Sequence, residues 1–190
     1  MNQRRTRYAL CLISLTIILT FMSTAAGDIV VPKIVEQKEF SIIGIEARTN
    51  NAKEMTDDGV IPKRWDKFIK EGILQKIPNK VDPTIFVVYA DYASDRNGDY
   101  AYVIGAKVSD VSTVPPGMVL KKVPKGRYAV LTSAKGQVQK IVPEAWRQIW
   151  SLEDNSHLGG PRSYKTDFEV YDQRSQNPQD SQVDIYVGIK

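Results

Sequence analysis

An internal repeat is the feature of this 190-residue chain that most limits its fold. Three pairs of segments match in the same order at spacings of 81, 82 and 83 residues: IPKRWDKFIKEGI with VPEAWRQIWSLED, FVVY with FEVY, and YVIGAK with YVGIK. The first pair places Trp65 over Trp146, and the third places Gly105 over Gly188. A nearly constant spacing over three matches in the same order indicates that one structural unit occurs twice.

Hydrophobic periodicity predicts the order β-α-β-β in each unit. The expected strands are Phe40–Asn50, Thr84–Tyr92, Tyr100–Val108, Met118–Ser133, Tyr164–Tyr171 and Val183–Lys190. One helix is expected to begin at Pro62 and to bury Trp65, Phe68, Ile69 and Ile73, and another is expected over Pro143–Leu152. Asn97-Gly98 is typical of a hairpin turn. This order predicts an α+β fold in which a largely antiparallel sheet carries two main helices and a central cleft lies between the repeats.

The predicted domain organisation has a leader and one duplicated domain. The leader covers residues 1–26, and the domain covers 38–190, with repeat one at 38–111 and repeat two at 117–190. The segment STVPPG between the repeats is short and proline-rich, which indicates a stiff connector.

The leader has the features of an export signal. Three arginines precede an apolar run of about 15 residues, which is shorter than the ~20 that a spanning helix needs, and Thr24-Ala25-Ala26 provides small residues for cleavage. We therefore expect a periplasmic or secreted protein with no stable membrane insertion after cleavage. The alternative is a protein anchored to the inner membrane by an uncleaved leader.

Composition excludes several kinds of site. Without the leader's three arginines, 23 basic residues face 22 acidic ones, so the net charge is +1 and no nucleic acid partner is expected. The basic group Lys121, Lys122, Lys125 and Arg127 is explained by a solvated edge strand. Cys11 lies in the leader, and His157 is expected in an exposed loop. Cysteine catalysis and cysteine zinc sites are thereby excluded, and no metal and no cofactor is expected.

Glu169 raises a question because it replaces Val87 of the sister strand. Strand alternation places Glu169 and Tyr171 on one face and Phe168 on the other. For an isolated strand the solvent face is the simpler interpretation. The sister pair of Val87 and Tyr89 has a buried character, however, which favours a pocket.

The duplicated order, the helix proline followed three residues later by tryptophan, and the FExY strand together resemble the GyrI-like small-molecule-binding domain. This domain serves as the effector-binding module of AraC-type and MerR-type transcription regulators. The resemblance covers residues 38–190 and implies an aromatic cleft that contains an acidic residue, here Glu169. It implies Trp65 and Trp146 as further residues of the cleft wall. Tyr89 and Tyr171, which lie on the same strand faces as Val87 and Glu169, complete the candidate ligand-binding residues. Trp150, on the same helix face as Trp146, is expected in the core.

Three functions are compatible with the sequence. The first is an exported binding protein that captures amphipathic, cationic or polar aromatic small molecules. The second is a hydrolase of a strained electrophile, which the resemblance allows. Glu169 would be the general acid or base, and Tyr171 or Tyr89 would orient water or polarise the leaving group. The third is a ligand-sensing partner of an envelope protein. Binding without turnover is the leading hypothesis, in which no residue is catalytic.

Overall fold

The computed structural model describes residues 31–190, so the predicted leader, with Cys11, lies outside the described residues. One eight-stranded antiparallel sheet and four α-helices make up the fold. In chain order the elements are β1 (Lys33–Gln37), β2 (Phe40–Thr49), α1 (Asn51–Glu54), α2 (Ile61–Lys70), α3 (Ile73–Lys76), β3 (Lys80–Ala90), β4 (Tyr100–Val108), β5 (Val119–Val123), β6 (Gly126–Thr132), α4 (Val138–Asp154), β7 (Arg162–Tyr171), a 3-10 turn (Gln173–Ser175) and β8 (Asp184–Ile189). The predicted α+β class is confirmed.

The strand order makes the repeat visible. It runs β1-β6-β8-β7-β3-β4-β2-β5. When β1 is exchanged with β5, β2 with β6, β3 with β7 and β4 with β8, the same order results, read from the other end. A pseudo-twofold axis therefore passes through the central β3–β7 pair. At this pair Val87 lies directly opposite Glu169. The valine and glutamate that the repeat aligns are neighbours across the axis.

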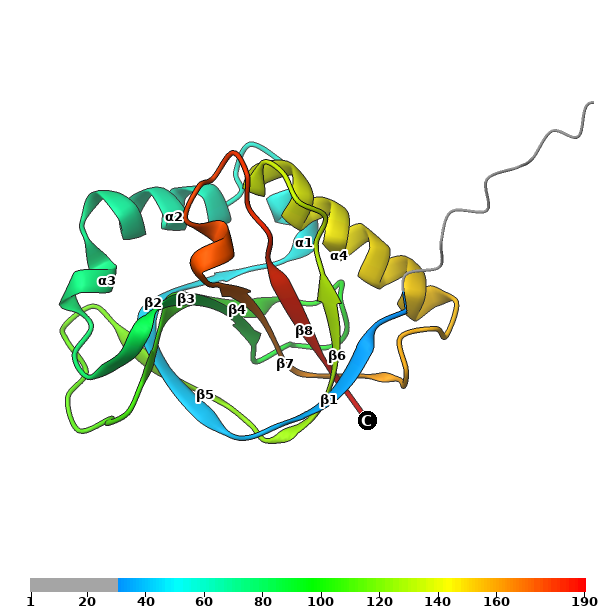
Figure 1. The fold of residues 1–190 in the computed structure, drawn as a ribbon, viewed down its shortest axis with the longest axis horizontal. Coiled ribbons are helices and arrows are strands. Elements are labelled where there is room, and N and C mark those ends of the chain that lie inside the picture. The colour runs from blue at the N-terminus through cyan, green and yellow to red at the C-terminus, as the bar shows by residue number, and fades with distance from the viewer. Residues whose placement is uncertain (1–30) are drawn as a thin grey trace, which may run out of the picture.

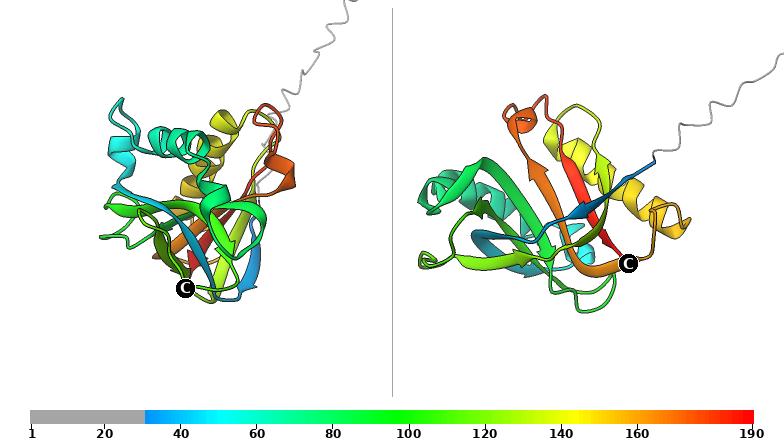
Figure 2. Two further views of the ribbon diagram at one scale, coloured as in Figure 1. Left: turned by 90° about the vertical axis from the view of Figure 1, so that its left-hand side faces the viewer. Right: turned by 60° about the horizontal axis from the view of Figure 1, so that its bottom comes forward.

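The two repeats exchange their first strands. The register of β1 with β6, from Lys33↔Val130 to Gln37↔Gly126, continues unchanged into that of β2 with β5, which begins at Phe40↔Val123. One long two-stranded ribbon results, and it curves back across the face of the sheet opposite the helices (Figure 1). Figure 2 shows the same curvature from two further directions. Neither repeat can separate without breaking this ribbon.

The ribbon corrects two sequence predictions. Met118–Ser133 is not one strand, because Pro124 has no backbone N–H to donate and the chain turns there before Gly126. The strand β1 was not predicted, since its short and mostly exposed sequence carries little hydrophobic signal. Within the ribbon, Lys121 and Lys122 lie on β5 at the end of the strand order, which agrees with the expected edge strand.

The helices lie together on the other face of the sheet (Figure 1). Helix α2 has Pro62 in its first turn, as predicted, and buries Phe68. Two details were wrong. Ile69 is 69% exposed, and Ile73 is buried from the separate helix α3, which follows Gly72 in the left-handed conformation with φ of 60°.

Helix α4 is longer than predicted. It begins at Val138, so that Pro143 lies inside the helix and not at its start. A proline there removes one backbone hydrogen bond and disfavours a straight helix, which is why the sequence indicated a boundary. His157 lies in an exposed loop after α4, as expected.

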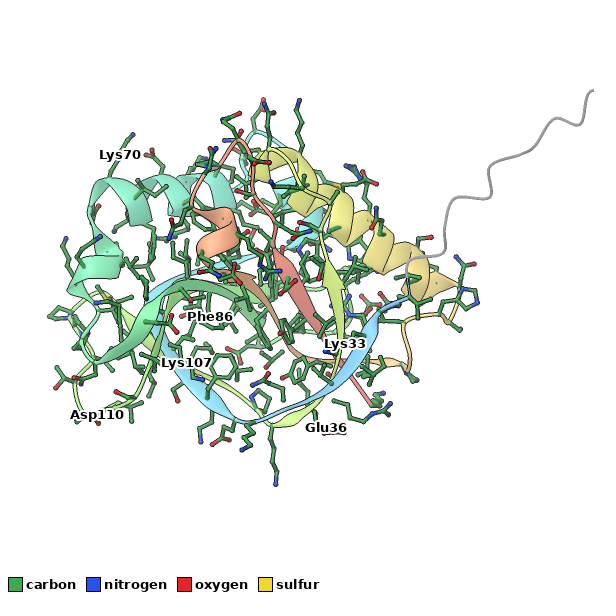
Figure 3. The ribbon with its side chains drawn as sticks, in the orientation of Figure 1. Lys33, Glu36, Lys70, Phe86, Lys107 and Asp110 are labelled. Atoms are coloured by element: carbon green, nitrogen blue, oxygen red, sulfur yellow. The ribbon has the colours of Figure 1, made fainter. Side chains whose placement is uncertain are left out.

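Two hydrophobic cores flank the sheet. The helix-side core contains Val87, Ile104 and Trp146, while the ribbon side is enclosed around Phe168. The Phe168 ring stacks on Tyr186 with centroids 4.4 Å apart. Phe86 lies in this second core, whereas charged side chains such as Lys70 point outward (Figure 3). Burial on both faces forces alternation along the part of β7 from Asp167 to Tyr171.

The close pairing of β2 with β4 depends on two glycines that face each other. Gly44 pairs with Gly105, and a Cβ atom on Gly105 would lie 2.0 Å from the backbone oxygen of Ile43. We predict that Gly105→Ala lowers the free energy of unfolding by about 3 kcal/mol, because the contact is with backbone and the strands must separate. Urea unfolding monitored by circular dichroism measures this loss.

Gly126→Ala is the matched control. A Cβ atom there would meet only the Tyr128 ring at 4.0 Å, so we expect a change within about 0.5 kcal/mol. Equal losses for the two variants would contradict the close approach of β2 and β4.

Candidate functional site

The carboxylate of Glu169 is buried on the helix side of the sheet with only 1% of the residue exposed. Three side chains donate hydrogen bonds to it. The Tyr89 hydroxyl and Trp146 Nε1 reach Oε1 at 2.8 and 2.6 Å, and the Tyr171 hydroxyl reaches Oε2 at 2.7 Å. Strand alternation thus directed Glu169 inward, and the solvent-face interpretation is wrong.

Burial sets the electrostatics of this cluster. Desolvation raises the pKa of Glu169 above its usual value, and the three hydrogen bonds oppose this by stabilising the charged form. Burial, followed by the nearby Glu169 charge, raises the pKa of Tyr89 and of Tyr171 well above the usual value. Both phenols therefore keep their protons and remain donors.

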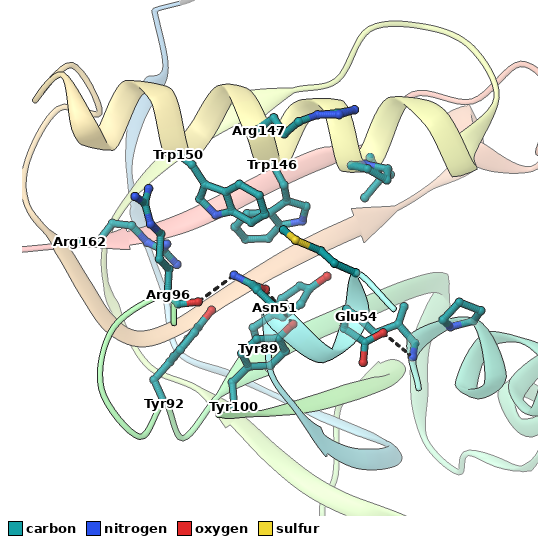
Figure 4. Close-up of a pocket in the computed structure, with 15 residues that line it drawn as sticks. Asn51, Glu54, Tyr89, Tyr92, Arg96, Tyr100, Trp146, Arg147, Trp150 and Arg162 are labelled. Atoms are coloured by element: carbon teal, nitrogen blue, oxygen red, sulfur yellow. Dashed lines mark hydrogen bonds between the residues drawn. The ribbon is translucent and has the colours of Figure 1, made fainter. Parts of the chain in front are cut away.

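A cavity of about 420 Å³ lies between α4 and the segment from α1 to the start of α2 (Figure 4). Most of its wall is aromatic or apolar. The lining residues are Asn51, Glu54, Met55, Ile61, Pro62, Tyr89, Tyr92, Arg96, Tyr100, Val142, Pro143, Trp146, Arg147, Trp150 and Arg162. Because both repeats contribute to the wall, the cavity is the predicted central cleft.

The five predicted ligand-binding residues divide into two groups. Tyr89 and Trp146 line the cavity and hold the Glu169 carboxylate behind them. Trp65 and Tyr171 do not line it, and instead pack edge-to-face with ring centroids 4.9 Å apart. The predicted cluster therefore exists, but only part of it borders the open space.

Trp150 corrects the prediction of a core residue. It is half-buried and lines the cavity beside Trp146, with ring centroids 6.4 Å apart. Its spacing of four from Trp146 predicted the shared helix face correctly. No sequence pattern indicated that this face of the helix borders an open cavity.

A second polar cluster at the cavity wall was missed altogether. Arg162 pairs with Asp167, and it also approaches Glu153 at 3.4 Å. The Tyr92 hydroxyl donates to Asp167 at 2.6 Å, and Arg96 pairs with Asp154 at 3.0 Å. These residues come from the end of α4, a turn and an irregular part of β7, where no periodic pattern marks them.

Glu54 is the one carboxylate that lines the cavity. It accepts hydrogen bonds from the backbone N–H groups of Val60 and Ile61 at 3.0 and 3.1 Å, and from the Thr49 hydroxyl. Its oxygens therefore anchor the segment that leads into α2. This role is structural and gives Glu54 less freedom to meet a ligand.

Within residues 31–190 no three side chains of the metal-binding types gather into a cluster that could hold an ion. Over the same residues no helix is long and apolar enough to cross a membrane.

Comparison with known proteins identifies the family. The model of the family named Cass2, integron-associated effector binding protein, matches residues 33–189, and the chain belongs to this family. The Bacillus subtilis (strain 168) protein YobU, named as a proposed transcriptional regulator, is 36% identical over 148 residues, which are 77% of this chain and 90% of YobU. The resemblance to effector-binding domains is thereby confirmed.

Two solved structures share the fold. An integron cassette protein from the mobile metagenome of Vibrio cholerae superposes with a TM-score of 0.67 and 25% identity, over 84% of this chain and 96% of the other. The protein SAV2435, solved bound to tetraphenylphosphonium, superposes with a TM-score of 0.68 and 15% identity, over 84% and 93% of the two chains. Both cover nearly the whole described fold.

The raised pKa of Glu169 predicts a stability effect. A carboxyl group whose pKa is higher in the folded protein stabilises the fold while protonated, and this contribution is lost as the pH rises from the unfolded pKa of about 4.3 through the folded pKa. We expect Glu169→Gln to unfold at a higher temperature than the wild type at neutral pH, since the amide carries no charge to bury. The difference should shrink in acid.

Tyr171→Phe provides the opposite control, because it removes a donor that stabilises the ionised carboxylate. It should lower the free energy of unfolding by about 1–3 kcal/mol at neutral pH. Calorimetry of the three proteins at several pH values checks both effects. A Glu169→Gln variant that is less stable than the wild type at every pH would contradict this account.

Proposed function

We propose that this protein is an exported capture protein for amphipathic cations, which bind in the cavity against Tyr89 and Trp146. The observation that carries the proposal is the Glu169 carboxylate directly behind these two rings. The cavity itself supplies a mainly apolar and aromatic surface of a size suited to a small organic molecule.

The electrostatic argument starts from the cost of burying Glu169. A carboxylate at 1% exposure has lost its hydration, and hydrogen bonds replace only part of it. A cation in the cavity is attracted by this charge at reduced dielectric, and by the ring faces at roughly 0.5–2 kcal/mol each. Because the phenol and indole donate to the carboxylate, their rings are richer in electron density, which strengthens the same attraction.

A fold neighbour supports the choice of ligand class. Tetraphenylphosphonium, the molecule bound to SAV2435, is a lipophilic cation. For this chain, the match to an effector-binding family supports the binding of a small molecule, and the buried carboxylate supports a cation as that molecule. Val87, the equivalent of Glu169 across the axis, fills space and carries no charge.

The hydrolase alternative receives less support from the geometry. A general base must reach the proton that it removes, either directly or through one water. Glu169 lies behind Tyr89 and Trp146 and already accepts three hydrogen bonds, and Tyr171 does not border the cavity. A role as the sensing partner of an envelope protein is compatible with capture and would use the same cavity.

Export is the second part of the proposal. The apolar leader and its small-residue cleavage site support it, and removal of residues 1–26 would leave Gly27 as the first residue. We expect mass spectrometry of the protein recovered from a bacterial envelope fraction to find this terminus. Recovery of the uncleaved chain in the cytoplasm would contradict export and leave ligand capture unaffected.

The test of capture is a titration of residues 27–190 with tetraphenylphosphonium and with neutral triphenylphosphine oxide. Since Trp146 and Trp150 line the cavity, binding should change tryptophan fluorescence. We expect Glu169→Gln to lose about tenfold or more in affinity for the cation and to bind the neutral compound as the wild type does. The cation affinity of the wild type should also fall as the pH drops through the raised pKa of Glu169.

The control is Val87→Ala, which alters the apolar side of the axis and leaves the carboxylate in place. It should retain the preference for the cation even if the protein is less stable. Equal affinities of Glu169→Gln and wild type for tetraphenylphosphonium would refute the proposed role of Glu169.

A further inference from the structure

A basic hollow, separate from the ligand cavity, lies where the start of β6, the irregular part of β7 and the end of β8 meet. The end of β8 is marked C in Figure 1. The hollow has a volume of about 360 Å³ and shares no lining residue with the cavity. No aspartate or glutamate lines it, whereas four cationic side chains do: Lys125, Arg127, Lys165 and Lys190.

The fold gathers these charges from distant parts of the sequence. Lys121 and Lys122, just before this segment, each pair with a carboxylate, at 2.6 and 3.1 Å. Lys125 has no such pair among residues 31–190. The pairing of β6 with β8, and of β8 with β7, instead places it at the same hollow as Lys190 and Lys165. The basic group of the sequence is thus divided into a neutralised half and a half that joins two further lysines.

The charges at the hollow do not balance. Arg127 Nη1 donates to the backbone oxygen of Lys190 at 3.0 Å, which offsets the α-carboxylate of this last residue of the sequence. Within residues 31–190 the ammonium groups of Lys125, Lys165 and Lys190 take part in no ion pair. Glu36 lies opposite Arg127 on β1 but does not line the hollow. Three like charges around one hollow repel one another, and an anion between them would relieve this repulsion.

The backbone of β7 is irregular at this hollow. Tyr164 has a positive φ of 50°, which non-glycine residues rarely adopt, and β7 loses its register with β8 between Arg162 and Asp167. Irregular strand positions of this kind re-aim side chains. Here they present Ser163 and Lys165, on either side of Tyr164, to the hollow. The Ser163 hydroxyl adds a neutral hydrogen-bond donor to the ammonium groups.

The number of donors decides which anion fits. A phosphate monoester carries roughly 1.5–2 negative charges and three strong acceptor oxygens at neutral pH. Lysine ammonium groups bind such oxygens as compact charges with several N–H donors. A carboxylate has one charge and two oxygens, and it would leave part of the positive charge without a partner.

We propose that this hollow is a phosphate-binding site, in which the ammonium groups of Lys125, Lys165 and Lys190 and the Ser163 hydroxyl hold one phosphate group. A free phosphate ester and the headgroup of an anionic phospholipid both carry this group. The site uses none of the residues of the proposed cation cavity, so it does not depend on the proposed function.

A titration of the protein with glycerol 1-phosphate at constant ionic strength tests the site. We expect saturable shifts of the backbone amide resonances of Gly126, Lys165 and Gly188. The double variant Lys125→Gln, Lys165→Gln should bind at least about tenfold more weakly, because it removes two charged donors. Since both ammonium groups are exposed and unpaired among the described residues, this variant should fold as the wild type does.

The double variant Lys76→Gln, Lys140→Gln is the matched control. It removes the same charge from two exposed lysines on α3 and α4, which do not line the hollow. We expect it to bind glycerol 1-phosphate as the wild type does. Equal weakening in both double variants would show an effect of overall charge and refute the site, as would the absence of saturable shifts in the wild type.

Vesicles separate the two sources of the phosphate group. Flotation with equimolar phosphatidylglycerol and phosphatidylcholine, against phosphatidylcholine alone, measures binding to an anionic lipid surface. Retention of the wild type on the anionic vesicles, lost in Lys125→Gln, Lys165→Gln, would assign the site to a lipid headgroup. Binding of glycerol 1-phosphate without retention would assign it to a free phosphate ester, and the absence of both would refute the proposal. Cation capture is measured separately with tetraphenylphosphonium, which both double variants should bind as the wild type does.

Discussion

The buried carboxylate of Glu169 is the group on which the arrangement of the candidate site depends. Because both faces of β7 are covered, alternation leaves Glu169 no route to solvent, and the ionised group must be stabilised from within. Three hydrogen-bond donors supply that stabilisation: Tyr89 from β3, Trp146 from α4, and Tyr171 from β7 itself. Three hydrogen bonds offset part of the desolvation, and the raised pKa of Glu169 reports the part that remains. A captured cation would supply the missing compensation.

Duplication explains how one site arises from a symmetric fold. Strand exchange in the ribbon ties the two repeats together, and the axis brings Val87 and Glu169 face to face in the β3–β7 pair. A single substitution between the repeats therefore makes the middle of the sheet asymmetric. Trp146 donates to the carboxylate and borders the cavity, whereas its counterpart Trp65 packs against Tyr171. The symmetry of the repeats places Val87 and Glu169 opposite each other, and the difference between these two side chains gives the site its carboxylate.

The repeat, the strand alternation and the aromatic helices allowed the fold class, and an inward-facing Glu169 among aromatic residues, to be predicted from the sequence. The exchanged ribbon could not be predicted, since strands of one sequence can pair within a repeat or between repeats with the same alternation. Arg162 was missed for a different reason. A register shift separates Arg162 from Asp167 along β7, and Tyr164 between them has a positive φ of 50°, so the alternation that located Glu169 does not hold there. Sequence spacing likewise could not distinguish Tyr89, at the cavity, from Tyr171, behind it.

The central claim is that the charge of Glu169 and the bound cation are coupled, and proton exchange on binding measures that coupling most directly. Tetraphenylphosphonium binding to the wild type would be followed by calorimetry in buffers of different ionisation enthalpy across the acidic and neutral range. The account predicts that binding releases a proton at pH values near the raised pKa of Glu169, and that the release disappears well above that pKa, where the carboxylate is already ionised. Binding of equal strength at every pH, with no proton released, would contradict it.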